Sequence, residues 1–447
     1  MKTKDEYLSI TEPLNGFNDI CGQEARIKNF LANRISQVFQ EWGYDQIIFP
    51  IIEKSSCFSE RVVGGSPWPE WDKCSIFYIN TKDYHDSYFD LPKKNDALLI
   101  PEGTISVSRW LAKSLVNKRI KVFFPKKVFY ITPCYRNELV SKISSTKKRE
   151  FTQVGIEILG SNSFIADIEI LLLIHEGFKT LGIDSKMELI RLGNVEIFNA
   201  LCRESAMDND TRIILKNKMD IIAEARAGKE PERLQPEIKN VMKIVKNLKL
   251  TDKLIKKWNI MTNTYKRQLD EQTINTLGYK NEARKLNKMA KILTSYGVNC
   301  VIDLSVVRSH EYYTGIVYEI DLKFEDKVFV EVAGGGRYNR LISKFLAKRN
   351  YQIPAVGFAY GLERICEYFR LISKNLNKKI SVDFWVDKEN VDVVILLKSK
   401  TAKNIIKVIN LANNLRREGK RVDIFVGDDQ LKSEEYAKNL HADLIII

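Results

Sequence analysis

The stretch from Arg149 to Gly160 constrains the fold of this chain more than any other. Its apolar residues alternate at Val154, Ile156 and Ile158, which predicts a strand with one buried face. The intervening positions are mostly polar, and Gly155 leaves room for a close approach to the backbone. Polar side chains on a central strand are costly unless they find partners. The stretch is therefore either a hairpin strand with a solvated end or one wall of a binding site.

A second predicted strand, residues 128–131, leads to the charged sequence Tyr135-Arg136-Asn137-Glu138. The segment between the two strands, residues 139–148, is polar and carries three lysines. This pattern predicts an antiparallel pair joined by a long basic loop, with charged residues at its mouth.

Length and charge set the limits for the rest of the chain. A chain of 447 residues is too long for one core, so two or three domains are expected. The net charge of +14 attracts polyanions, although a Lys-rich codon usage explains it equally well. No apolar run reaches the ~18 to 20 residues that span a bilayer, and the first residues lack the apolar core of a signal peptide. We therefore expect a cytoplasmic protein with no membrane partner.

The predicted elements divide the chain into regions. Sheet-forming sequence occupies residues 1–194 and 299–372, and the strongly helical block 195–298 reads as an insertion between them. Residues 373–388 are the best linker, and residues 389–447 show a β-α-β-α-β pattern that predicts a small domain with a parallel sheet. The seven scattered cysteines and four histidines do not predict a protein metal site.

Near the N-terminus, a helix over residues 22–42 is followed by Gly43 as its cap. A strand over residues 44–52 contains Pro50, which belongs at an edge or bend. This segment can pack against a symmetry mate or against its own domain. Further on, Pro101-Glu102-Gly103-Thr104 is a turn into a helix, and we expect Thr104 as the N-cap.

Charged residues and glycines recur where predicted strands stop. Arginines stand at three such ends, Arg136, Arg308 and Arg364. Guanidinium groups bind phosphate oxygens in a bidentate manner, so this pattern suits a nucleoside triphosphate. The sequence has no GxxxxGK[ST] loop and no GxGxxG after a first strand, so arginines would do the work of a phosphate-binding loop.

These segments resemble the class II aminoacyl-tRNA synthetases, and among them the histidyl-tRNA synthetases. Residues 43–50, residues 135–138 with 149–151, and residues 357–364 are similar to the three class II motifs. Residues 308–315 and 335–338 are similar to the two histidine-specific segments, and residues 101–104 to the amino-acid loop. The resemblance implies an α/β fold, with an α+β catalytic domain on an antiparallel sheet, a helical insertion and an anticodon-binding-like C-terminal domain.

The resemblance also implies a role for each matching residue. Arg136 would hold the α-phosphate of ATP, Glu138 the adenine amino group and Arg364 the γ-phosphate, with Phe151 stacked on adenine. Arg308 would bridge the histidine carboxylate and the α-phosphate, which makes Arg136, Arg308 and Arg364 the catalytic residues. The remaining amino-acid-binding residues would hold the ammonium group (Glu102, Thr104, Gln153) or the side chain (Glu157, Tyr312, Tyr313). The implied substrates are histidine, ATP with Mg²⁺ and tRNA(His), bound by a homodimer; DNA is not expected.

This chain departs from the family pattern at several places. Ser309-His310-Glu311 replaces the usual Gly-Leu-Asp, and Ile100 stands where an arginine is common. The loop 139–148 is longer than usual and has Lys147 at an arginine position. The C-terminal domain is short, so the contact with an anticodon would be weakened.

Three functions remain open from the sequence. The first is histidine activation and transfer to tRNA(His). The second, from a different class, is a histidine-sensing regulatory subunit of ATP phosphoribosyltransferase, although that subunit lacks the C-terminal domain. The third is a paralogue that activates histidine or an analogue for an acceptor other than tRNA.

Overall fold

The computed structural model divides the chain into two compact units. One contains residues 1–20 and 28–372, and the other contains residues 21–27 and 373–447. The structure describes the following residues: 11–64, 75–79, 97–117, 123–137, 148–228, 230–308, 310–324, 328–346, 352–375, 391–397, 401–425, 430–440 and 442–447.

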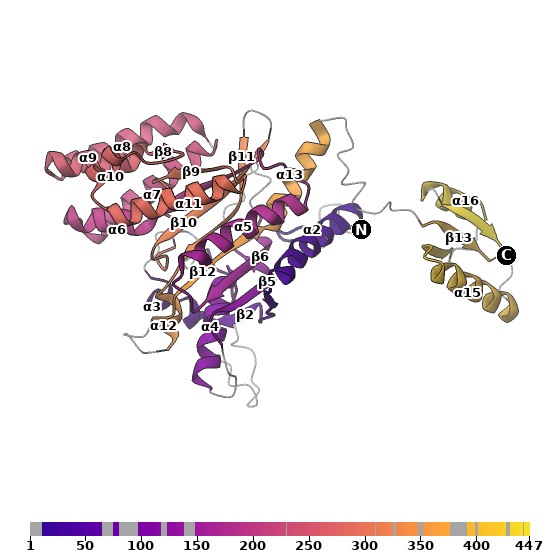
Figure 1. Ribbon diagram of the computed structural model, residues 1–447. Coiled ribbons are helices and arrows are strands. Elements are labelled where there is room, and N and C mark those ends of the chain that lie inside the picture. Colours follow the sequence, from indigo (N-terminus) through magenta and orange to yellow (C-terminus); the bar gives the residue numbers. More distant parts are fainter. Residues whose placement is uncertain are drawn as a thin grey trace, which may run out of the picture. The chain divides into compact units, whose positions relative to one another are not determined.

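A nine-stranded sheet forms the centre of the first unit (Figure 1), in the order β1-β5-β6-β12-β11-β10-β7-β9-β8. Its strands are β1 (Asp45–Gln46), β5 (Lys126–Tyr135), β6 (Glu150–Leu159), β7 (Glu188–Asn194), β8 (Tyr265–Lys266), β9 (Cys300–Asp303), β10 (Ile316–Phe324), β11 (Val328–Arg337) and β12 (Ala355–Gly361). Within the run β5, β6, β12, β11 and β10, each adjacent pair of strands is antiparallel, whereas β1 pairs parallel with β5. The predicted α/β class with an antiparallel central sheet is confirmed.

The predicted hairpin of β5 and β6 is also confirmed, with Lys126 opposite Leu159 and Tyr135 opposite Glu150. The burial of β6 differs from the prediction of one buried face. Nearly every residue from Val154 to Leu159 is buried, on both faces of the sheet. Because β6 lies between β5 and β12 and has packed layers above and below it, its polar residues must find partners inside the protein.

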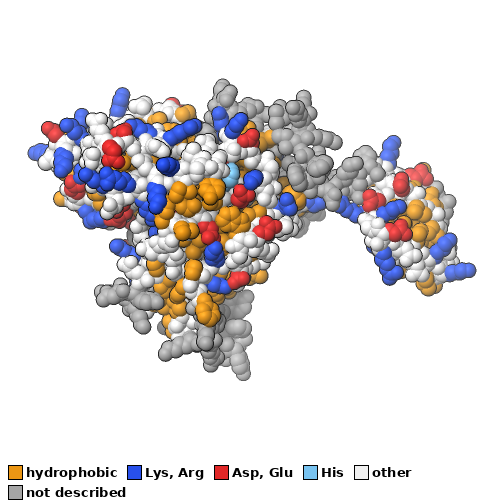
Figure 2. All heavy atoms as spheres, in the orientation of Figure 1, with side chains coloured by type: hydrophobic (Ala, Val, Ile, Leu, Met, Phe, Trp, Pro, Cys, Tyr) orange, Lys and Arg blue, Asp and Glu red, His pale blue; other side chains and the backbone are white. Residues whose placement is uncertain are grey.

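Helices cover the sheet at both faces and extend beyond one edge. Those of the sheet region are α2 (Gly22–Glu41), α3 (Glu60–Val63), α4 (Gly103–Val116), α5 (Phe164–Thr180), α12 (Leu341–Phe345) and α13 (Leu362–Asn375). A further group gathers near β8 and β9 (Figure 1): α6 (Val195–Glu204), α7 (Asn209–Arg226), α8 (Leu234–Asn247), α9 (Asp252–Asn263), α10 (Glu271–Leu277) and α11 (Lys280–Ser295). In the same view Figure 2 shows many Lys and Arg side chains over this helical group.

A small antiparallel sheet in the order β2-β4-β3 accompanies the large one in the first unit. Its strands are β2 (Ile52–Lys54), β3 (Tyr78–Ile79) and β4 (Ala97–Leu99). Since β4 runs directly into α4, this sheet places the turn Pro101–Thr104 beside β5 and β6.

The second unit contains a three-stranded parallel sheet in the order β14-β13-β15. The elements are β13 (Val393–Leu396), α15 (Ala402–Arg417), β14 (Val422–Phe425), α16 (Gln430–Asn439) and β15 (Asp443–Ile446). The predicted β-α-β-α-β order and parallel pairing are confirmed. Across the described part of the chain, no helix combines the length and apolar character needed to cross a bilayer.

Candidate active site

A cavity over the antiparallel strands collects most of the residues predicted as site residues. Eight of them line it: Glu102, Thr104, Arg136, Phe151, Gln153, Arg308, Tyr313 and Arg364. Glu157 and Tyr312 lie behind this lining and bond to its members. Glu138 and the loop residue Lys147 lie outside the described residues. Residues as distant in sequence as 102 and 364 therefore meet in one place.

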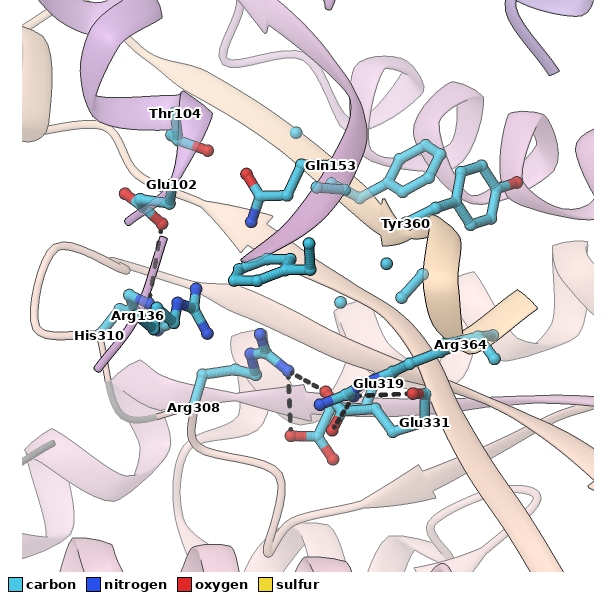
Figure 3. Close-up of a pocket in the computed structure, with 18 of the residues that line it drawn as sticks. Glu102, Thr104, Arg136, Gln153, Arg308, His310, Glu319, Glu331, Tyr360 and Arg364 are labelled. Carbon is cyan, nitrogen blue, oxygen red and sulfur yellow. Dashed lines mark hydrogen bonds and ion pairs between the residues drawn. The ribbon is translucent and has the colours of Figure 1, made fainter. Parts of the chain in front are cut away.

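One end of the cavity is a cluster of arginines and carboxylates (Figure 3). Nη1 of Arg308 donates to Glu319 at 3.2 Å and to Glu331 at 2.8 Å. Nη1 of Arg364 donates to the other oxygen of Glu331 at 3.2 Å and to its backbone carbonyl at 2.7 Å. The Nε donor of Arg308 is buried and has no hydrogen-bond partner among the described residues. A buried guanidinium with an unused donor is suited to an anionic ligand.

Behind this cluster lies a buried row of ion pairs. Arg191 on β7 is 1% exposed and donates to Glu319 at 2.7 Å and to Asp321 at 2.5 Å. Its strand neighbours explain the contact, because Glu319 is opposite Arg191 in the β7–β10 register. Glu319 thus joins a fully buried arginine to the arginine that faces the cavity. The positive charge of Arg308 is therefore balanced by carboxylates on the strands of the sheet and not by solvent.

The opposite end of the cavity surrounds Glu157, which is fully buried on β6. Tyr338 donates to one of its oxygens at 2.6 Å and Thr104 to the other at 2.8 Å. Burial raises the pKa of Glu157 to about 8, against the lowering effect of these two hydroxyl donors. A carboxyl group poised near neutrality, flanked by hydroxyls, can accept from or donate to an uncharged imidazole.

The prediction that Thr104 caps α4 is wrong. Glu102 occupies the N-cap position and makes no side-chain cap bond, while Thr104 lies in the first turn. Its hydroxyl is used by Glu157 instead. A tertiary hydrogen bond to a buried carboxyl outweighs a local cap, because an unsatisfied buried oxygen costs more than an uncapped amide that can reach water.

His310 and Tyr312 complete the wall around Glu102. Tyr312 donates to Glu102 at 2.8 Å, and His310 Nε2 lies 3.7 Å from the same carboxylate oxygen (Figure 3). Burial lowers the pKa of His310 well below its ordinary value, and the positive charges of Arg308 and Arg136 add to this effect. His310 therefore contributes a neutral imidazole to the cavity lining, where the family pattern has a leucine.

Two of the residues predicted to bind ATP, Arg136 and Phe151, lie against each other. The guanidinium of Arg136 is 4.9 Å from the centre of the Phe151 ring, and its Nε donates to the carbonyl of Pro101 at 3.0 Å. These contacts fix the plane of the guanidinium beside the ring. Gln153 accepts from the amide of Gly103 at 2.9 Å, which ties β6 to the same turn.

Several lining residues were missed from the sequence. Glu319 and Glu331 lie on strands whose interiors read as ordinary alternating pattern, and Asp220 and Glu224 come from α7 in the block predicted as an insertion. Glu319 lies opposite Arg191 in the sheet, and Glu319 and Glu331 both accept from Arg308; only these tertiary contacts distinguish them from surface carboxylates. Pairing register was the missing signal.

The arginines of the cavity suit the recognition of an anion. Among the described residues, no three His, Cys, Asp or Glu side chains converge as metal ligands. Arg308 and Arg364 face the cavity and have donors for phosphate oxygens. This set suits a magnesium ion that is carried in on the triphosphate, because Mg²⁺ prefers substrate phosphates, water and few protein carboxylates.

The chain is similar to known proteins both in sequence and in fold. A family model described as histidyl-tRNA synthetase matches residues 87–365. The histidine–tRNA ligase of Sulfolobus acidocaldarius is 28% identical over 407 residues, covering 90% of this chain and 86% of that one. The corresponding ligase of Saccharolobus solfataricus is 29% identical over 425 residues, covering 94% and 86%. A solved ATP phosphoribosyltransferase regulatory subunit/histidyl-tRNA synthetase from Bacillus halodurans shares the fold with a TM-score of 0.70, 20% identity and coverage of 98% and 99%.

Proposed function

Because the chain belongs to the histidyl-tRNA synthetase family, we propose that it activates histidine with ATP and transfers it to tRNA(His). The observation that carries this proposal is the pair of guanidiniums, Arg308 and Arg364, held at one side of a cavity whose other side carries a buried carboxyl between two hydroxyls. The first side suits a triphosphate and the second suits an imidazole.

In the proposed reaction, a histidine carboxylate oxygen bonds to the α-phosphorus of ATP. The bond from that phosphorus to the bridging oxygen breaks, and pyrophosphate leaves with the electron pair. Two anions must approach each other, so fixed guanidiniums at Arg136 and Arg308 would stabilise the charge that builds up on the α-phosphoryl oxygens. Mg²⁺ would arrive with ATP and neutralise part of the triphosphate charge.

In the second step, a hydroxyl of the terminal ribose of tRNA would attack the carbonyl carbon of the adenylate and release AMP. The positive net charge of +14 is consistent with a polyanionic acceptor. We further propose that residues 195–298 and 389–447 are separate functional regions, an insertion and an anticodon-binding-like domain.

A homodimer is part of the proposal. The segment that follows β1, up to the first residue of β2, exposes large apolar side chains that a single chain leaves in water: Ile48 is 87% exposed and Ile52 is 51% exposed. Clustered exposed apolar residues of this kind are typical of an interface. Sedimentation velocity would test it, and a monomer at micromolar concentration would contradict it.

The decisive assay is histidine-dependent ATP–pyrophosphate exchange, followed by charging of a tRNA(His) transcript. Exchange and charging support the proposal. Exchange without charging favours the paralogue that serves another acceptor. Histidine binding without exchange favours the regulatory alternative, a function that the Bacillus halodurans protein of the same fold also bears in its name.

A further inference from the structure

The backbone of Arg308 is in the left-handed region, with φ of 51°. A residue other than glycine pays about 1 to 3 kcal/mol for such a conformation, and it persists only where the surroundings fix it. Arg308 also carries the guanidinium that joins Glu319 and Glu331. Whatever fixes the chain on either side of Arg308 therefore fixes the geometry of the phosphate-binding end of the cavity.

On the C-terminal side, the anchor is Glu311. Its carboxylate accepts from Arg212 at 3.0 and 3.1 Å and from Lys216 at 2.7 Å. Both cations lie on one face of α7, one turn apart. The Lys216 side chain is only 1% exposed, so this ion pair is shielded from solvent and from salt. Glu311 is one of the positions at which the chain departs from its family pattern.

The other side of Glu311 is closed by α3. A Cβ atom added to Gly64, which has φ of 83°, would lie 2.7 Å from Cβ of Glu311. The stem of Glu311 is thus packed between the end of α3 and the side of α7. A shift of this segment would disturb the ion pairs with α7 or the close packing against Gly64.

On the N-terminal side, the same helix provides the anchor. Arg226, the last residue of α7, donates to Asp303 at 2.6 Å and to Ser305 at 3.0 Å. One helix therefore holds the chain both before and after Arg308. Asp220 and Glu224, which lie between these anchors on α7, line the cavity itself.

We propose that Glu311 and Lys216, supported by Arg212, are positioning residues that hold Arg308 in its substrate-facing conformation, so that α7 sets the competence of the site for adenylate formation. None of the three touches the substrate in this proposal. The catalytic role of Arg308 depends on the proposed function. The anchoring of its segment depends only on the contacts of Glu311.

The test compares Lys216→Met with Lys257→Met. Lys257 is also buried, at 4% exposure, and pairs with Glu204 at 2.6 Å in the same helical group, so its loss is a matched structural defect. In pyrophosphate exchange, Lys216→Met should lower kcat by roughly 100-fold with little change in KM for ATP, because the transition-state contact is misplaced. Lys257→Met should keep kcat within about twofold.

A second readout does not depend on activity. Amide hydrogen exchange over residues 310–316 should become faster in Lys216→Met and stay unchanged in Lys257→Met. If Lys216→Met fails to fold, the same two measurements are made on Glu311→Gln, which changes the less buried partner of this ion pair. An inactive wild-type protein contradicts the proposed function and leaves the amide-exchange test standing.

Equal kcat and equal protection in the two methionine variants would overturn the inference. Faster amide exchange with an unchanged kcat would overturn it as well, because the segment would then be loosened without consequence for Arg308.

Discussion

Arg308 and Arg364 donate from their Nη1 atoms to opposite oxygens of one carboxylate, that of Glu331, at 2.8 and 3.2 Å. Two guanidiniums 56 residues apart in sequence, by their numbering, are thereby held on one carboxylate. Their mutual repulsion is balanced before any substrate arrives. A triphosphate would meet a prearranged pair of donors.

Replacing Arg308 by alanine should remove exchange activity by roughly 100- to 1000-fold in kcat, the usual loss for one preorganised electrostatic contact. The measurement is histidine-dependent pyrophosphate exchange at saturating ATP. Arg340→Ala is the control, since Arg340 is an exposed arginine outside this cavity. Comparable losses in the two variants would contradict a specific role for Arg308.

Gly334→Ala should also displace the guanidinium of Arg308 and lower the exchange activity. A Cβ atom at Gly334 would lie 2.4 Å from Nη1 of Arg308, so the guanidinium must move. We expect kcat for exchange to fall by roughly 10- to 100-fold at a nearly unchanged melting temperature. Gly315→Ala is the matched control, because its Cβ would meet Arg337 only at 3.8 Å. The idea fails if both variants behave like wild type.

Glu157→Gln should change the pH dependence of stability. Burial raises the folded-state pKa of Glu157 to about 8, above its unfolded value of about 4.3. The folded state therefore holds the proton more tightly, and this contribution to stability is complete below the unfolded pKa and is lost as pH rises to about 8. Glutamine does not titrate.

The melting temperature of Glu157→Gln relative to wild type should therefore rise steadily from pH 5 to about pH 8.5. Thermal unfolding at four or five pH values in matched ionic strength would measure it. A difference that is constant with pH would show that Glu157 has an ordinary pKa.

Arg191→Met should destabilise the first unit by about 3 to 5 kcal/mol, because it removes the buried guanidinium that Glu319 and Asp321 share. Urea unfolding would measure the loss. Arg284→Met, which removes an exposed pair with Glu271, should cost less than about 1 kcal/mol. Similar midpoints for the two variants would show that the buried row contributes little.

The sequence predicted the strands of the sheet better than the side-chain contacts of the site. Alternation at Val154, Ile156 and Ile158 predicted β6, and the apolar run 128–131 predicted its partner β5, because such short patterns are typical of strands. The three arginines were identified because they follow strands and match family motifs. The family resemblance itself is confirmed by the match over residues 87–365.

The counter-ions of these arginines were not predictable in the same way. Glu319 and Glu331 face Arg308 only because β10 and β11 pair in a given register, interrupted between Ile320 and Asp321. Local sequence does not encode a register between strands. The contribution of α7 was missed for a related reason: the block 195–298, rich in charged residues, is expected to be solvated until its neighbours are known. The role assigned to Glu138 remains a prediction, since this residue lies outside the described residues.

The carboxylates around the cavity have a consequence for how substrates arrive. The lining carries six acidic residues, Glu102, Asp220, Glu224, Glu319, Glu331 and Glu363, against four cations, Arg136, Lys148, Arg308 and Arg364. Although the chain has a net charge of +14, the cavity lining has no positive excess to draw in a bare tetra-anion. Magnesium-bound ATP, with about half that charge, and an amino acid with an ammonium group face the smaller electrostatic barrier. The rate of nucleotide capture should thus depend on divalent cation more than on bulk salt.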